Sequence, residues 1–83
     1  MTETESSIYD FIVKDVLRGR GEGLEVDTPL LDLNILDSFR IMTVLAYIEE
    51  ELGVMIAPEE LDKKAFNSIR SISALVDSQR SLA

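Results

Sequence analysis

The sequence predicts an all-α domain, a bundle of three main helices and one short helix with a long ordered loop between the first two. Two observations lead to this prediction. Apolar residues recur three and four positions apart in three segments, which is the period of helices that bury one face. No alternating strand pattern competes with these segments, and only residues 54–56 form a short extended candidate.

The first helix is predicted over residues 8–17. Its apolar positions fall at helical spacing: Ile8, Phe11, Ile12 and Val16. Ser6 or Ser7 is expected to cap its first turn, because a serine side chain accepts a hydrogen bond from an unpaired backbone N–H. Three glycines between residues 19 and 23 end the helix, since their backbone freedom is costly to fix.

The connection over residues 19–36 is longer than most loops in compact domains. Its second half is rich in apolar residues: Leu24, Val26, Leu30, Leu31, Leu33, Ile35 and Leu36. Thr28-Pro29 prevents a helix from running through this segment. We therefore expect an ordered, functional loop that packs against the helices, and not a linker.

The strongest helical pattern begins at Asp37 or Ser38 and stops before Gly53. Its apolar stripe is Ile41, Val44, Leu45, Ile48 and Leu52. The opposite face is expected to meet solvent and carries Arg40, Thr43, Tyr47 and Glu50. Residues 49–51 are all glutamates near the C-terminal end, where the helix dipole disfavours negative charge. Contact with a partner explains them, and so does general solubility.

Two further helices are predicted after residue 57. Pro58 followed by two glutamates fits the first turn of a short helix that ends by Lys64 or Phe66. Asn67 or Ser68 then caps the last helix. The inward positions of that helix are Ile69, Ile72, Leu75 and Val76.

Composition excludes several classes of function. Eighty-three residues are expected to form one domain, residues 1–83, because so short a chain cannot support a second core. Sixteen acidic residues against eight basic ones give a net charge of −8, which repels nucleic acid and anionic membranes. A basic partner surface is the natural counterpart of this charge, and the protein itself is expected to be a monomer.

The chain contains no cysteine and no histidine. The first absence fits a reducing compartment, and neither an export signal nor a membrane span is recognisable, so we expect a cytoplasmic protein. The second absence removes the commonest general base and the commonest nitrogen ligand of metals. We therefore expect that the protein is not an enzyme, has no catalytic residues and has no metal site.

The segment Ile35-Leu36-Asp37-Ser38-Phe39 places a serine hydroxyl at the start of the second main helix. Unpaired backbone N–H groups and the positive end of the helix dipole stabilise an anion there by about 0.3–1 kcal/mol at an exposed site, which suits a phosphodiester on Ser38. An ordinary helix cap has the same appearance, so three residues alone do not decide between these interpretations.

Five segments together resemble an acyl carrier protein in order and spacing across nearly the whole chain. They are Thr28-Pro29-Leu30-Leu31, Leu36-Asp37-Ser38-Phe39, residues 48–54, Ile56 and Pro58-Glu59-Glu60-Leu61. The resemblance implies a four-helix carrier bundle in which Ser38 carries a covalent 4'-phosphopantetheine. It also implies that Asp37 assists the phosphopantetheinyl transferase and its Mg²⁺, and that the helix after Ser38 docks partner enzymes.

The branch of the family is indicated by two details. Modular peptidyl carriers usually have Gly-Gly-His before the serine, whereas residues 35–37 are Ile-Leu-Asp, so the chain is similar to a discrete, type II carrier. Residues 63–66 with Ile69, Ile72, Ser73 and Tyr47 are similar to free-standing aminoacyl carriers of natural-product, nonribosomal-peptide and antibiotic pathways, including prolyl carriers. The implied cargo is an aminoacyl or acyl thioester, loaded by an adenylating ligase and passed to tailoring or condensing enzymes.

Two alternatives stay open. One is a fatty-acid or polyketide acyl carrier, although Arg40 and Thr43 stand where fatty-acid carriers commonly have acids. The other is a non-covalent, acidic helical interaction module. The candidate docking residues are Phe39, Arg40, Met42, Ala46, Glu49 and Glu50. For Phe39 and Met42, ordinary core packing is an equally good interpretation.

Overall fold

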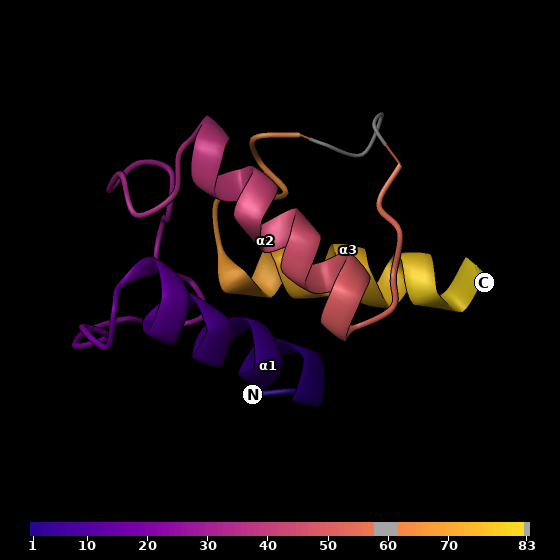
Figure 1. Cartoon of the computed structure of the whole chain (residues 1–83), viewed down its shortest axis with the longest axis horizontal. Coiled ribbons are helices and arrows are strands. Elements are labelled where there is room, and N and C mark those ends of the chain that lie inside the picture. Colours follow the sequence, from indigo (N-terminus) through magenta and orange to yellow (C-terminus); the bar gives the residue numbers. More distant parts are fainter. Residues whose placement is uncertain (58–61, 83) are drawn as a thin grey trace.

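The protein is described by a computed structural model that covers residues 1–57 and 62–82. It contains three α-helices, α1 (Glu3–Phe11), α2 (Ser38–Glu51) and α3 (Ile69–Leu82), and a π-helical turn, η1 (Ile12–Val16), that continues α1. Figure 1 shows α2 crossing the other helices obliquely, while the long connection from η1 to α2 gathers at one end of the molecule. The predicted all-α class is confirmed.

The short helix expected from Pro58 begins in residues 58–61, which lie outside the described part of the chain. The described residues that follow, 62–68, form turns. A fourth helix therefore stays a prediction.

The start of the first helix was predicted wrongly. The N-cap is Thr2, whose Oγ1 accepts a hydrogen bond from the Glu5 N–H at 3.1 Å, while the Thr2 N–H donates to Glu5 Oε1 at 2.7 Å. This reciprocal pair is a capping box, and it places Ser6 and Ser7 inside α1. The start of the helix was not recognised because its first turn is polar and shows no apolar periodicity. The acids of this turn suit the positive end of the helix dipole.

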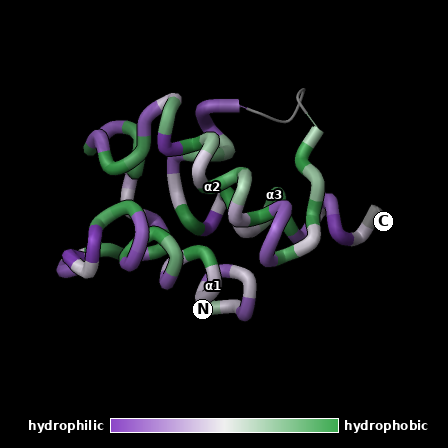
Figure 2. The backbone as a smooth tube through the Cα atoms, in the orientation of Figure 1, coloured by the Kyte–Doolittle hydropathy of each residue, from purple (hydrophilic) through white to green (hydrophobic). Residues whose placement is uncertain are grey.

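One core joins all three helices and the connection between them. Its buried hydrophobic residues are Ile8, Ile12, Leu24, Leu30, Leu36, Val44, Leu45, Ile48, Val54, Ile56, Phe66, Ile69, Ile72 and Val76. Figure 2 shows hydrophobic stretches interleaved with hydrophilic ones along each helix, as expected for helices with one buried face. The predicted stripes of α2 and α3 are confirmed, with Ile41, Leu52 and Leu75 only partly buried.

The connection before α2 packs on the start of α3. The Leu30 and Leu31 N–H groups donate to the backbone and side-chain oxygens of Asn67 at 2.7 and 2.9 Å. The Arg70 N–H donates to the Val26 carbonyl at 3.0 Å. Asn67 thus holds the connection, and the cap of α3 is Ser68, whose Oγ accepts from the Ser71 N–H at 3.1 Å.

Two side chains do not lie where their patterns predicted. Leu33 was expected to pack inward, but it is 59% exposed because it lies in a turn closed by a hydrogen bond from its N–H to the Pro29 carbonyl. Tyr47 was expected to face solvent, but it is half-buried and stacks on Phe11. Within the described part of the chain, no helix combines the length and hydropathy that a bilayer crossing requires.

Candidate functional site

The candidate site begins where the connection meets α2. Asp37 is the N-cap, and its Oδ1 accepts a hydrogen bond from the Arg40 N–H at 2.8 Å. Ser38 follows as the first helical residue and is exposed. No hydrogen bond among residues 1–57 and 62–82 involves the Ser38 hydroxyl, so the capping role belongs to Asp37 and the serine oxygen is available for chemistry.

The electrostatics of this helix end favour an anion. α2 has 14 residues, so its aligned peptide dipoles leave partial positive charge on the unpaired N–H groups of the first turn. That turn contains no acidic residue, and only the Asp37 carboxylate occupies one of its donors. A phosphate ester at Ser38 is therefore placed favourably.

A hollow of about 220 Å³ opens beside the serine. It is lined by Ser38, Ile41, Asp62, Lys63 and Phe66. Ile41 and Phe66 give it apolar walls, and Lys63 and Asp62 bring one positive and one negative charge to the neighbourhood of Ser38. The turn over residues 62–68 carries Lys63 and Phe66 to this place from a distant part of the sequence.

The predicted docking residues lie along the exposed side of α2. Phe39 is 81% exposed and Met42 is 62% exposed, so the core-packing interpretation of these two side chains is wrong. Ala46, Glu49 and Glu50 are also exposed on the same helix.

Arg40, the remaining predicted docking residue, is exposed but hydrogen-bonded to the connection. Its Nη1 donates to the Ile35 carbonyl at 3.2 Å, which ties α2 to the end of the connection. Leu33 adds an exposed apolar residue to the connection that precedes Ser38.

Two residues that line the hollow with Ser38, Lys63 and Phe66, were missed as site residues, and so was the exposed Leu33 in the preceding connection. The alternation of Leu33 with Asp32 and Asn34 was a usable signal, because a hydrophobe between two turn-forming residues is a candidate for a turn tip. Nothing local indicated that Lys63 and Phe66 approach Ser38, since that contact depends on tertiary packing.

The family of phosphopantetheine attachment sites matches residues 11–76. The chain therefore belongs to this family of carrier proteins, whose cofactor is 4'-phosphopantetheine attached covalently to a serine. It is a carrier and not an enzyme. Carrier proteins of this kind work with phosphopantetheinyl transferases and with biosynthetic enzymes.

Two proteins are similar to this chain, and the first is named as a carrier protein. The "Probable acyl carrier protein PigG" of Serratia sp. (strain ATCC 39006) is 35% identical over 72 residues, which are 87% of this chain and 83% of that protein. A chain in the "Crystal structure of FAD-dependent dehydrogenase" superposes with a TM-score of 0.77 at 36% identity, covering 83% of this chain and 97% of that chain. The matches cover 83% of the first similar protein and 97% of the second similar chain.

Proposed function

We propose that residues 1–83 form a single, discrete carrier domain that bears 4'-phosphopantetheine on Ser38. The domain holds an aminoacyl or acyl group as a thioester and delivers it to enzymes of natural-product biosynthesis. The prosthetic group supplies the thiol that a chain without cysteine lacks. The protein acts in the cytoplasm as a monomer, and the short helix near Pro58 and the long ordered loop before Asp37 complete its bundle.

We choose Ser38 as the attachment residue because of the environments of the serines in the matched segment. Four serines lie within the matched segment: Ser38, Ser68, Ser71 and Ser73. Ser68 and Ser71 share a hydrogen bond of 2.9 Å, and Ser73 is only 2% exposed. Ser38 alone combines exposure, the start of a helix and a hydroxyl without a hydrogen-bond partner in the described residues.

The residues around Ser38 fit the chemistry of the group. The N-terminal turn of α2 and the side chain of Lys63 suit a phosphate, and Ile41 and Phe66 suit the apolar part of a pantetheine arm. Asp37 holds the helix start with one carboxylate oxygen and is exposed, so it remains accessible to the Mg²⁺ of a transferase.

The docking surface consists of Phe39, Arg40, Met42, Ala46, Glu49 and Glu50 on α2. A few charges around a small apolar strip suit complexes that form and release quickly. Its partners are the phosphopantetheinyl transferase, an adenylating ligase that loads the arm, and tailoring or condensing enzymes. A flavin-dependent dehydrogenase is one such tailoring enzyme, because a chain of similar length belongs to the crystal structure of an FAD-dependent dehydrogenase.

Intact-mass measurement after co-expression with a broad-specificity phosphopantetheinyl transferase tests the attachment. We expect the chain and its Ser71→Ala variant to gain the mass of the group and Ser38→Ala to gain none. Ser71→Ala is the matched control because Ser71 is a partly exposed serine within the matched segment. A chain that never gains mass would favour the non-covalent interaction module, and modification of Ser38→Ala would place the group elsewhere.

The cargo needs a second measurement. The modified chain is incubated with single adenylating enzymes and their amino acids, and the product is weighed. Loading with an amino acid supports the aminoacyl carrier, whereas loading only by acyl-transferring enzymes supports the fatty-acid or polyketide alternative.

A further inference from the structure

All three methionines of the chain lie at its surface. Met1 and Met55 are each 72% exposed and Met42 is 62% exposed, whereas the buried hydrophobic residues of the described core are isoleucine, leucine, valine and phenylalanine. A methionine side chain often fills irregular gaps in a core, because it is unbranched and flexible. None does so here, so a chemical change at a methionine sulfur leaves the packing of this core intact.

The methionine sulfurs are the groups of this chain that peroxides oxidise most readily. Cysteine, the other side chain with an easily oxidised sulfur, is absent from the sequence. Exposure decides which sulfurs react, because the oxidant has to reach them from solvent. An oxidant that meets the protein therefore acts first on Met1, Met42 and Met55.

Met42 differs from the other two methionines in its position on α2. It lies four residues after Ser38, which puts the two side chains on the same side of the helix and about 6 Å apart along its axis. Phe39 and Ala46, three residues before Met42 and four residues after it, are exposed neighbours on that side. Met42 is thus the middle residue of the apolar strip in the docking surface.

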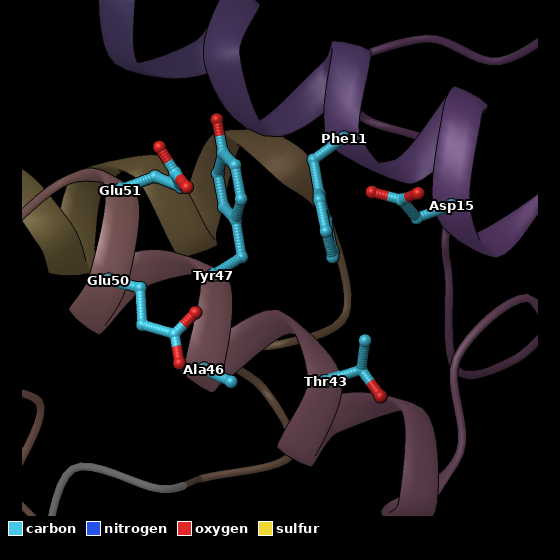
Figure 3. Close-up of a pocket in the computed structure, with 7 residues that line it drawn as sticks. All are labelled: Phe11, Asp15, Thr43, Ala46, Tyr47, Glu50 and Glu51. Carbon is cyan, nitrogen blue, oxygen red and sulfur yellow. The ribbon is translucent and has the colours of Figure 1, made fainter.

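The side of α2 that carries Met42 is not the side that meets α1. The contact with α1 is made by Tyr47, whose ring stacks on Phe11 with centroids 4.2 Å apart (Figure 3). The Tyr47 hydroxyl donates to the Ser7 carbonyl at 3.2 Å, which fixes the ring against α1. Five residues turn a helix by about 500°, so Met42 lies about 140° around α2 from Tyr47. Its side chain is therefore reached without any movement of the helices.

We propose that Met42 is a site of reversible oxidation to methionine sulfoxide, which weakens the docking of partner enzymes at Ser38. The oxidant is hydrogen peroxide. A lone pair of the Met42 sulfur attacks one peroxide oxygen, the O–O bond breaks and an S–O bond forms. The departing hydroxide takes the proton of the transferred oxygen and leaves as water. The sulfur loses two electrons and the peroxide gains them.

The sulfoxide places a polar oxygen in the middle of the apolar strip. A partner that packs on Phe39 and Met42 then buries a hydrogen-bond acceptor against apolar groups, which is unfavourable. Sulfoxide reductases return the sulfur to the thioether, so the change is reversible. The inference rests on the proposed function, because the docking that is weakened is that of the enzymes that modify and load Ser38.

Mass spectrometry locates the oxidation. The unmodified chain and its Met42→Leu and Met55→Leu variants are treated with hydrogen peroxide, which is removed before any assay. Leucine keeps an apolar side chain of similar volume and has no sulfur to oxidise. Peptide mapping should find a sulfoxide at Met42 in the wild-type chain and in Met55→Leu, and circular dichroism should show unchanged helix content. An intact Met42 beside oxidised Met1 and Met55, or a loss of helix content, would overturn the proposal.

The rate of phosphopantetheine transfer by a broad-specificity transferase measures the docking. After oxidation, kcat/KM should fall about 5- to 30-fold for the wild-type chain and for Met55→Leu. Met42→Leu should keep the rate that it had before treatment, and sulfoxide reductases should restore the rate of the wild-type chain. An equal fall in Met42→Leu would show that the lost rate does not come from Met42 and would refute the site.

The outcomes separate this proposal from the proposed function. If the unoxidised wild-type chain gains no prosthetic group, the docking surface loses its partner and both proposals fail. If the chain gains the group equally fast before and after Met42 is oxidised, Ser38 remains the attachment residue and the proposal for Met42 alone fails.

Discussion

The charged residues at the two ends of α2 have opposite effects on the stability of the helix. At its N-terminal end the Asp37 carboxylate caps the helix and complements the positive end of the dipole. At its C-terminal end three glutamates in succession face the negative end of the dipole without a basic residue in the last turn. Residues that stabilise the helix locally need no further reason, whereas residues that oppose the dipole need one, and here contact with a partner and general solubility both supply it. The comparison therefore directs attention to the acidic end as well as to the serine.

The largest expected effect concerns the packing of Phe66 near the N-terminal end of α2. Phe66 is 1% exposed and lines the hollow beside Ser38. Phe66→Ala should lower the free energy of unfolding by about 3–5 kcal/mol, because it removes apolar burial and leaves a cavity. Urea unfolding followed by circular dichroism measures the change.

Phe39→Ala is the matched control for this prediction. It deletes the same ring one residue after Ser38, but that ring is exposed, so unfolding should change by less than about 0.5 kcal/mol. Comparable losses in both variants would contradict the assignment of Phe66 to the core and Phe39 to the surface.

The next effect concerns the cap. Asp37→Ala should destabilise the protein by about 1 kcal/mol, because the Arg40 N–H loses its acceptor. Asp37→Asn keeps a capping oxygen and should restore most of this stability. If the carboxylate also serves the transferase, Asp37→Asn will remain slow to gain the prosthetic group although its stability is nearly restored. Recovery of both properties would assign Asp37 to the cap alone.

Much of the fold was predictable because helix positions and caps are encoded by residues close together in the sequence. The period of Val44, Leu45 and Ile48 identified α2 and its buried face, because a long amphipathic helix encodes its orientation locally. Asp37 could be placed at the helix start by the same local logic. The start of α1 was missed although Thr2 and Glu5 have the local spacing of a capping box. The burial of Thr4, which hydrogen-bonds to Asp77 73 positions away, could not be predicted from local periodicity.

The site was predictable only in part. Ser38 and the exposed residues of α2 follow from one continuous segment and its resemblance to carrier proteins. The hollow beside Ser38 requires the turn that carries Lys63 and Phe66, and the stacked pair of rings requires Phe11 of α1 to meet Tyr47 of α2. Both contacts arise from packing between segments, so no spacing rule reveals them.

A smaller effect tests the contact between α1 and the acidic end of α2. Tyr47→Phe keeps the stacked ring but removes the hydrogen bond to the Ser7 carbonyl, which should cost about 0.5–1.5 kcal/mol. The Tyr47 pKa is raised in the folded state, so the native protein holds this proton more tightly than the unfolded chain. Its contribution is complete below about pH 10, the ordinary tyrosine pKa, and is lost as the pH rises through the folded pKa.

Urea unfolding at pH 7 and at several values above pH 10 measures both parts of this prediction. The wild-type chain should lose stability more steeply with alkaline pH than Tyr47→Phe. Parallel curves would show that the phenol is not protected by the fold.

The smallest effect has the opposite sign. Glu51→Gln should raise the free energy of unfolding by about 0.3–1 kcal/mol, since it removes a negative charge from the last turn of α2. Glu25→Gln, which lies outside any helix, should change stability less. Thermal unfolding at low ionic strength measures the difference, and added salt should reduce it. A loss of stability in Glu51→Gln would remove the physical contrast between the two ends of α2.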